Sequence, residues 1–349
     1  LLYHAGTGGI EGAGRGDFSL ALVSAFVPDL RATGRAEVDL NVGGTVEEPD
    51  LAGSLQVERG RLRWLGFPRT LEEFDLRVSL EGPTAEVVRY NGVLGGGEVG
   101  GSGWVRFGDG GLDSYRLELE GRGVRLEWPE GFQGAYDADL ALEGDAGRST
   151  LRGRVDVLRG VYDEEFELMH ALGVGTREYS TDELGEIGHD LRFDVDLEAR
   201  DNVWVRNELA ELEARFDLHL GGSLQRPELT GRISVLEGGK LEFRNGQYRI
   251  LAGHEDFVDL DRLDPRVYLR AETTVGNYEI YLRVEGTLER FEYELTSSPA
   301  LAQQDIIALL AGGQTLQDVS GGPTREGADF TGDLAANYFA GALTAPFER

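Results

Sequence analysis

The residues that could carry chemistry are five histidines, a run of aspartates and a glycine-rich segment. The histidines do not pair at the spacing of metal ligands, and the chain contains neither an HExxH motif nor a cysteine. The run Asp259-x-Asp261-x-x-Asp264 lacks the loop glycine and the terminal glutamate of an EF-hand. No lysine with serine or threonine follows the glycines of 95–103, so a phosphate loop is not expected. We therefore predict a protein that is not an enzyme, with no catalytic residue, no metal site and no cofactor.

The composition is that of a folded, acidic chain with many turns. Its 349 residues include 51 glycines, 63 acidic residues and 34 basic residues, which gives a net charge of −29. Nucleic acids and anionic membrane surfaces attract clustered basic residues, so this charge argues against both as partners. No window of about 18 apolar residues is present, and we expect no membrane-spanning helix. Because the chain begins with leucine instead of methionine, we expect it to be a piece of a longer protein.

Apolar and polar residues alternate along most of the chain, which is the pattern of a half-buried β-strand. In 35–42 every second residue is apolar and the residues between are polar, and 191–199 and 212–220 repeat this pattern. Successive side chains of a strand point to opposite faces, so each run has an apolar face and a charged face. The apolar face includes Val38, Leu40, Val42, Leu117, Leu119, Leu140, Leu142, Phe193, Val195, Leu197, Phe216, Leu218, Leu220, Ile280, Leu282 and Val284.

Turn signals separate these runs and predict an antiparallel sheet. Asn91-Gly92 and Asn245-Gly246 suit tight hairpins, whose central residues need positive φ angles. A pattern G-x-h-x-h-x-x-G, in which h is apolar, recurs at 53–60, 153–160 and 231–238. We interpret each repeat as a strand, a turn and the start of the next strand. Strands of about six to eight residues would then number about 25 and form a sheet that elongates by repetition.

Helices are few in the predicted architecture. The clearest is 299–311, because Pro299 fits a first helical position and Gly312 fits a helix end. A second helix is expected at about 332–344, and a loop or short helix at 168–188. The helix 299–311 could simply pack on the end of the sheet, or it could act as a gate or a docking element for a partner. Its apolar side chains are Leu301, Ile306, Ile307, Leu309 and Leu310.

One or two short helices cannot cover the apolar face of so many strands, and large uncovered apolar patches are unusual unless they bind something. Three arrangements solve this problem. The sheet could fold over into a sandwich, close into a transmembrane barrel with its apolar face toward lipid, or curl into an open trough. Periodicity alone does not choose among them.

A chain of motifs within 191–313 resembles the C-terminal domain of the TamB family, in the wider AsmA-like group of envelope proteins. The motifs are LRFDVDLEARDNVWVRN (191–207), a segment over 220–272, and VEGTLERFEYELTSSPALAQQDIIALLAGG (284–313). The most specific piece is S-S-P-x-L-x-x-x-D-I-I-x-L-L-x-x-G at 297–313. The resemblance implies an all-β fold, namely an elongated, curled antiparallel sheet with an apolar interior, like a taco, and one or two short helices near the C-terminus.

The resemblance also implies an organisation and a role. We expect a repeating β-groove segment at 1–190, a TamB-like C-terminal domain at 191–313, and a loop and helix at 314–349, shortened relative to the family. The full-length protein would be anchored in the inner membrane, cross the periplasm and contact membranes at its ends. It would carry phospholipid between the inner and outer membranes for outer-membrane biogenesis, with an Omp85-class, TamA-like barrel as partner and the apolar face as lipid lining.

Two other functions stay open at this stage. Exposed strand edges could template nascent outer-membrane β-strands, which would make the protein a scaffold or assembly factor acting with the Omp85-class partner. A passive extracellular sheet resembling an adhesin is the third possibility.

Overall fold

The structure is a computed structural model. It describes residues 2–4, 9–25, 27, 29–45, 49–65, 67, 69–108, 111–128, 131–145, 147–163, 190–207, 210–243, 246–257, 266–287 and 291–312. The second predicted helix (332–344), the segment 314–349 and the predicted loop or helix at 168–188 lie outside these residues.

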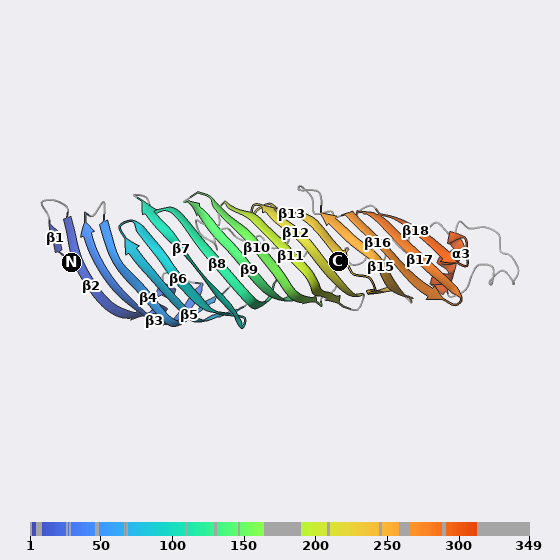
Figure 1. The fold of residues 1–349 in the computed structure, drawn as a ribbon, viewed down its shortest axis with the longest axis horizontal. Helices are drawn as coiled ribbons and strands as arrows, with labels where there is room; N and C mark the ends of the chain where they lie inside the picture. The colour runs from blue at the N-terminus through green and yellow to red at the C-terminus, as the bar shows by residue number, and fades with distance from the viewer. Residues whose placement is uncertain are drawn as a thin grey trace.

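The described residues form one long curved sheet whose strands follow one another along its axis in chain order (Figure 1). The eighteen strands of these residues occupy seventeen positions, because β13 and β14 lie one after the other between β12 and β15. The strands are β1 (Leu2–His4), β2 (Gly9–Ser19), β3 (Leu30–Gly44), β4 (Pro49–Trp64), β5 (Leu71–Glu81), β6 (Thr84–Leu94), β7 (Gly97–Gly108), β8 (Gly111–Glu127), β9 (Phe132–Asp145), β10 (Ser149–Tyr162), β11 (Leu191–Arg206), β12 (Ala210–Gly222), β13 (Pro227–Val235), β14 (Lys240–Phe243), β15 (Gly246–Phe257), β16 (Arg266–Val275), β17 (Tyr278–Thr287) and β18 (Phe291–Ser298). A 3-10 helix, η1 (Leu20–Ala25), and an α-helix, α3 (Gln303–Gly312), complete the described fold.

The sheet confirms the predicted all-β architecture, with one departure from antiparallel pairing. Neighbouring strands pair antiparallel except β10 and β11, which are parallel, with Ser149 opposite Leu191 and Tyr162 opposite Val205. Both strands therefore begin at the same edge of the sheet. The hydrophobic alternation of the two strands does not encode their direction, which is why the sequence did not reveal this pair.

The described strands are longer than the sequence predicted, because many of them continue through β-bulges. In β4 the register with β5 shifts between Val57 and Gly60, and in β10 the register with β9 shifts between Val157 and Arg159. In the first two copies the G-x-h-x-h-x-x-G pattern therefore marks a bulge inside a strand, and its interpretation as a turn was wrong there. The third copy interrupts the strand without reversing it, since β13 ends at Val235 and β14 continues in the same direction.

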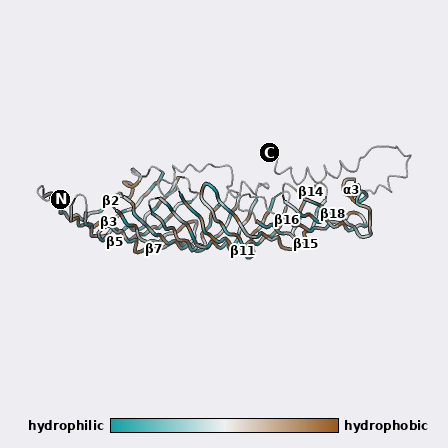
Figure 2. Tube along the Cα trace, turned by 90° about the horizontal axis from the view of Figure 1, so that it is seen from above, coloured by the Kyte–Doolittle hydropathy of each residue, from teal (hydrophilic) through white to brown (hydrophobic). Residues whose placement is uncertain are grey.

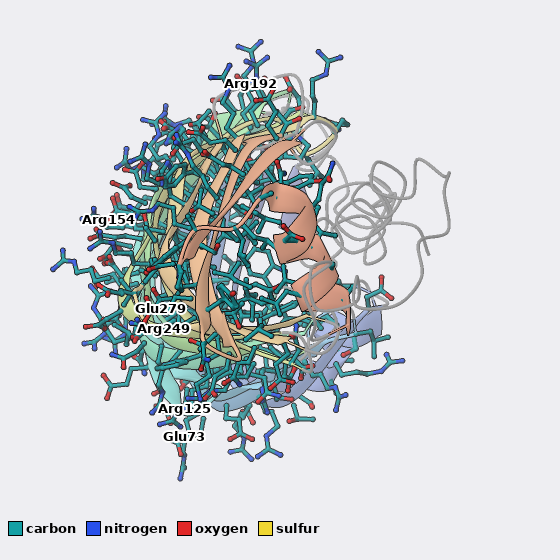
Figure 3. The ribbon with its side chains drawn as sticks, turned by 90° about the vertical axis from the view of Figure 1, so that its right-hand side faces the viewer. Glu73, Arg125, Arg154, Arg192, Arg249 and Glu279 are labelled. Atoms are coloured by element: carbon teal, nitrogen blue, oxygen red, sulfur yellow. The ribbon has the colours of Figure 1, made fainter. Side chains whose placement is uncertain are left out.

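Bulges recur near the same edge of the sheet in strand after strand. Residues with positive φ mark several of them: Arg59 at 48°, Glu73 at 51°, Gly123 at 63° and Asn202 at 60°. A bulge bends its strand and increases the local twist. Repeated along the sheet, the bulges account for the curvature that Figure 3 shows from the end of the molecule.

The hairpin signals were only partly correct. Asn91-Gly92 lies inside β6, where the Asn91 amide donates to Asp75 Oδ2 at 3.3 Å, so this predicted turn was wrong. The chain reverses instead at Gly95 and Gly96, whose φ angles are 58° and 77°. The predicted hairpin at 245–246 is confirmed by the pairing of β14 with β15, although its loop residues are outside the described part.

The helix α3 ends where the sequence predicted but starts at Gln303 instead of residue 299. The Ser297 hydroxyl accepts a hydrogen bond from the Leu301 N–H at 3.0 Å and donates one to the Pro299 carbonyl at 2.8 Å. These bonds hold a turn ahead of the helix, whose first intrahelical bond runs from the Ile306 N–H to the Ala302 carbonyl at 3.1 Å. Ser297 thus stabilises a turn before the helix and not its first turn.

Candidate functional site

The predicted apolar-face residues lie on one face of the sheet, in register across neighbouring strands. Leu117 stands opposite Leu142, and Leu119 stands opposite Leu140, across the β8–β9 pair. The face is the concave one, because the charged side chains labelled in Figure 3 project from the convex side. The positions are Val38, Leu40 and Val42 on β3, Leu117 and Leu119 on β8, Leu140 and Leu142 on β9, Phe193, Val195 and Leu197 on β11, Phe216, Leu218 and Leu220 on β12, and Ile280, Leu282 and Val284 on β17. Whether they bind lipid stays a prediction.

Residues that the sequence analysis did not select join these positions into a continuous strip. Leu151 on β10 connects Leu142 on one side with Phe193 on the other. Between β12 and β17, Ile233 of β13 packs with Leu218, Leu229 and Phe257. In the hydropathy-coloured trace of Figure 2, apolar and polar residues are interspersed along the length of the sheet.

The two ends of the concave face are covered by helices. At the N-terminal end, Leu20 of η1 packs on Ala32, Ala36 and Val57. At the C-terminal end, α3 lies against the concave side of β17 and β18, as Figure 3 shows.

The predicted gate or docking residues of α3 are the ones that make this contact. Ile306, Ile307 and Leu309 are buried with Ile280 and Leu295, and Leu301 and Leu310 pack against the same cluster. The structure thus shows the packing role of these residues. Their role as a gate or docking element stays a prediction.

Aromatic rings fill part of the concave face by lying over glycines of the adjacent strands. The Tyr90 hydroxyl reaches across Gly101 and donates to the Glu118 carbonyl at 2.9 Å. A Cβ atom on Gly101 would lie 2.8 Å from that hydroxyl, and one on Gly160 would lie 2.0 Å from the Phe132 ring. Tyr90 stands opposite Gly101, whereas Phe132 is diagonal to Gly160, so these contacts can be recognised only once the register is known.

The convex face is charged and carries a series of exposed ion pairs. Arg154 pairs with Glu198 at 2.8 Å and Arg152 with Glu143 at 2.7 Å. The hydrogen bond from Arg232 holds the pKa of Asp256 below its ordinary range. Exposed ion pairs of this kind each contribute at most about 1 kcal/mol to the stability of the fold. Their main effect is to keep the convex face hydrated.

Glu255 is the exception to the division of the two faces. It stands opposite Ile233 on β13 and Val267 on β16, and all three residues are at concave-face positions. Burial raises the pKa of Glu255 to about 7. Among the described strands, it is the one charged residue whose register position falls on the concave face.

No cluster of reactive groups is found in the described part of the chain. His219 lies on the convex face, with Nδ1 2.9 Å from Asp196 Oδ1. No group of three or more histidine or acidic side chains within the described ranges could hold a metal ion, and the run at 259–264 lies outside them. Among the residues that the structure describes, no helix combines the length and apolar character needed to cross a membrane.

One open sheet with a long apolar concave face and a charged convex face defines an elongated β-protein that offers an extended apolar surface. Residues 89–348 match the family model of the TamB C-terminal domain. The chain belongs to the TamB family, a non-enzymatic transport and assembly family of the cell envelope. The match begins well upstream of residue 191, where the sequence motifs placed the start of that domain.

Proposed function

We propose that this chain is a periplasmic conduit that carries phospholipid acyl chains along its concave face between the inner and outer membranes. The observation that carries this proposal is the succession of apolar positions on the concave face from β3 to β18, where the described helices cover its two ends. Acyl chains laid on such a strip would leave water at roughly 25 cal/mol per Å² of apolar surface. Headgroups would remain at the open side of the curved sheet, in water.

The dimensions of the sheet support movement along its axis. Seventeen strand positions at about 4.8 Å each give roughly 80 Å of continuous surface. This is several times the thickness of one membrane leaflet, so a lipid would advance over many equivalent positions. Within the described strands Glu255 is the one charged residue type on the strip, so few barriers of charge would oppose that advance.

The remaining parts of the proposal concern the full-length protein. It would be anchored in the inner membrane and would deliver lipid at its C-terminal end to an Omp85-class, TamA-like outer-membrane barrel. In this arrangement α3 lies where lipid would leave the concave face. The packing of Ile306 against Ile280 would have to loosen for lipid to pass.

A charge on an accessible part of the strip tests the conduit. Leu119 is on the concave face and is 39% exposed, so Leu119→Arg places a guanidinium in the path without burying it. Gln56→Arg adds the same charge on the convex face, at a position of β4 that lies between Glu37 and Arg77. We expect Leu119→Arg to reduce bound phospholipid in native mass spectrometry and to fail in restoring envelope integrity, while Gln56→Arg behaves as wild type. Equal lipid binding and equal restoration by both variants would refute the conduit.

The assembly alternative rests on the edge of the sheet. Among the described strands, β18 pairs on one side only, with β17, so Phe291–Ser298 offers backbone groups to a further strand. A photocrosslinker at Glu294 of β18 would report this. Crosslinks to nascent barrel strands, from a protein that purifies without lipid, would favour the scaffold over the conduit.

A further inference from the structure

The strongest feature outside the proposed conduit mechanism is one acidic side chain on an otherwise apolar surface. Glu255 is mostly buried on the concave face, and no described side chain donates a hydrogen bond or forms an ion pair with its carboxyl group. A buried carboxylate without a partner is costly, and such groups are normally neutralised or paired. This residue is therefore poised to accept a partner that the described part of the chain does not provide.

A bulge places Glu255 on this face. Between Ile250 and Ala252 the register of β15 with β16 shifts by one residue, so the alternation of faces changes phase there. His254 and Asp256 consequently point to the convex side, where His254 stacks on Tyr268 and Asp256 bonds Arg232.

The described strands on either side of Glu255 bring no compensating charge to the concave face. On β13 the concave-face neighbours are Gly231, Ile233 and Val235, and on β16 they are Val267 and Leu269. The nearby cations, Arg232 and Arg266, occupy convex-face positions opposite Asp256.

The location suits the polar end of an amphiphile. Glu255 is two residues from the end of β15, hence roughly 7 Å from the rim of the sheet. The apolar cluster of Leu218, Leu229 and Phe257 lies directly beside it. An acyl chain on this cluster would place its headgroup at the level of the Glu255 carboxylate.

We propose that Glu255 is a headgroup contact that selects amphiphiles with a primary ammonium group, such as phosphatidylethanolamine, as they occupy the concave face. This inference rests on the proposed function and adds a specificity to it. A primary ammonium offers three donors and a positive charge, which supply the partner that the carboxylate lacks. Because its pKa is raised, the Glu255 carboxyl group is only partly ionised near neutral pH. An arriving ammonium group would favour the ionised form.

The test is lipid competition. The purified chain is incubated with detergent-solubilised phosphatidylethanolamine, phosphatidylglycerol and phosphatidylcholine in equal amounts, and the lipids that copurify are quantified by mass spectrometry. The variants are Glu255→Gln and, as a matched control, Glu279→Gln on the convex face (Figure 3). Both substitutions replace one carboxyl group with a neutral amide of the same shape, so Glu279→Gln reports how the loss of a surface carboxylate alters general repulsion of anionic lipid.

We expect wild type and Glu279→Gln to enrich phosphatidylethanolamine. In Glu255→Gln the enrichment should be roughly tenfold lower, which is the effect expected when one charge-assisted hydrogen bond is lost. If Glu255→Gln does not fold, the wild-type chain at pH 5.5 replaces it, since protonation should remove the same preference. Enrichment that survives in Glu255→Gln, or equal enrichment of phosphatidylcholine, overturns this inference and leaves the conduit standing. A wild-type chain that binds none of the three lipids overturns the proposed function itself.

Discussion

Gly153 on β10 lies so close to Asp139 on β9 that a Cβ atom on the glycine would stand 2.1 Å from the Asp139 carbonyl oxygen. The φ angle of Gly153 is 136°, a conformation that only glycine adopts readily. Gly231 repeats the relationship against Asp217 at 2.2 Å with a φ of 120°. The first glycine of the repeated motif is thus required by the close approach of two backbones, whereas its last glycine accompanies a bulge.

Gly153→Ala should lower the free energy of unfolding by more than about 1 kcal/mol, because both the φ angle and the adjacent carbonyl oppose a side chain. Urea-induced unfolding followed by circular dichroism measures this. Gly16→Ala on β2 is the control, since a Cβ there meets nothing within 4 Å. The control should be neutral or slightly stabilising. Equal losses in both variants would show that the close approach at Gly153 is not what the motif preserves.

At a bulge residue with positive φ, substitution by glycine should raise the free energy of unfolding. Arg59 has a φ of 48°, while its backbone N–H donates to Asp75 Oδ1 at 2.8 Å, a bond that does not need the arginine side chain. Arg59→Gly should therefore raise the free energy of unfolding by about 0.5–1 kcal/mol, because the left-handed conformation costs every other residue more. Arg61→Gly, in the extended part of β4, should lower it by a similar amount. Destabilisation by Arg59→Gly would argue that its side chain, not its backbone, fixes the bulge.

The faces of the sheet could be predicted from the sequence, and the lengths of the strands could not. Alternation identifies the apolar side of 191–199 because side chains of a strand alternate by geometry. A bulge such as Val57 to Gly60 places glycine after a short run, which is also how a turn looks along a sequence. Only the pairing with β5 distinguishes the two, and pairing is a long-range property.

The same limit applies to the candidate site. The alternation within 278–284 placed Ile280 and Leu282 correctly on one face, whereas Glu255 falls within a polar run, His254 to Asp256, that looks like a solvated segment. The extra residue Leu251 reverses the phase of the alternation and turns Glu255 inward. A one-residue change of register moves every following side chain to the other face, so no local pattern could reveal this.

Ile306 anchors α3 to the sheet. It is fully buried against Ile280 and Leu295. Ile306→Ala should lower the stability of the C-terminal end by about 2–4 kcal/mol, since it removes buried methyl groups from a packed cluster. Hydrogen exchange should show lost protection in α3 and β18, with the strands near β8 unchanged. Gln304→Ala on the exposed side of the helix should leave exchange as in wild type. Uniform loss of protection along the sheet would contradict local anchoring.

Glu255 should make the stability of the chain depend on pH near neutrality. Its pKa is raised from the ordinary 4.5 to about 7, so the folded state binds its proton more tightly than the unfolded state does. The stability that this proton provides is present below about pH 4.5 and is lost as pH rises through about 7, at an upper limit of roughly 3 kcal/mol. Glu255→Gln should therefore be more stable than wild type at pH 8 and differ less at pH 5.

Urea unfolding of wild type and Glu255→Gln at both pH values measures this difference, with Glu279→Gln as the control for removal of a surface charge. Carboxylates whose pKa is lowered, such as Asp256 beside Arg232, lose their contribution only as pH falls below the ordinary carboxylate range. Their contribution to stability is therefore constant between pH 5 and pH 8. If the gap between Glu255→Gln and wild type stayed constant over this interval, the carboxyl group would have to be hydrated in the folded protein, contrary to its place between Ile233 and Val267.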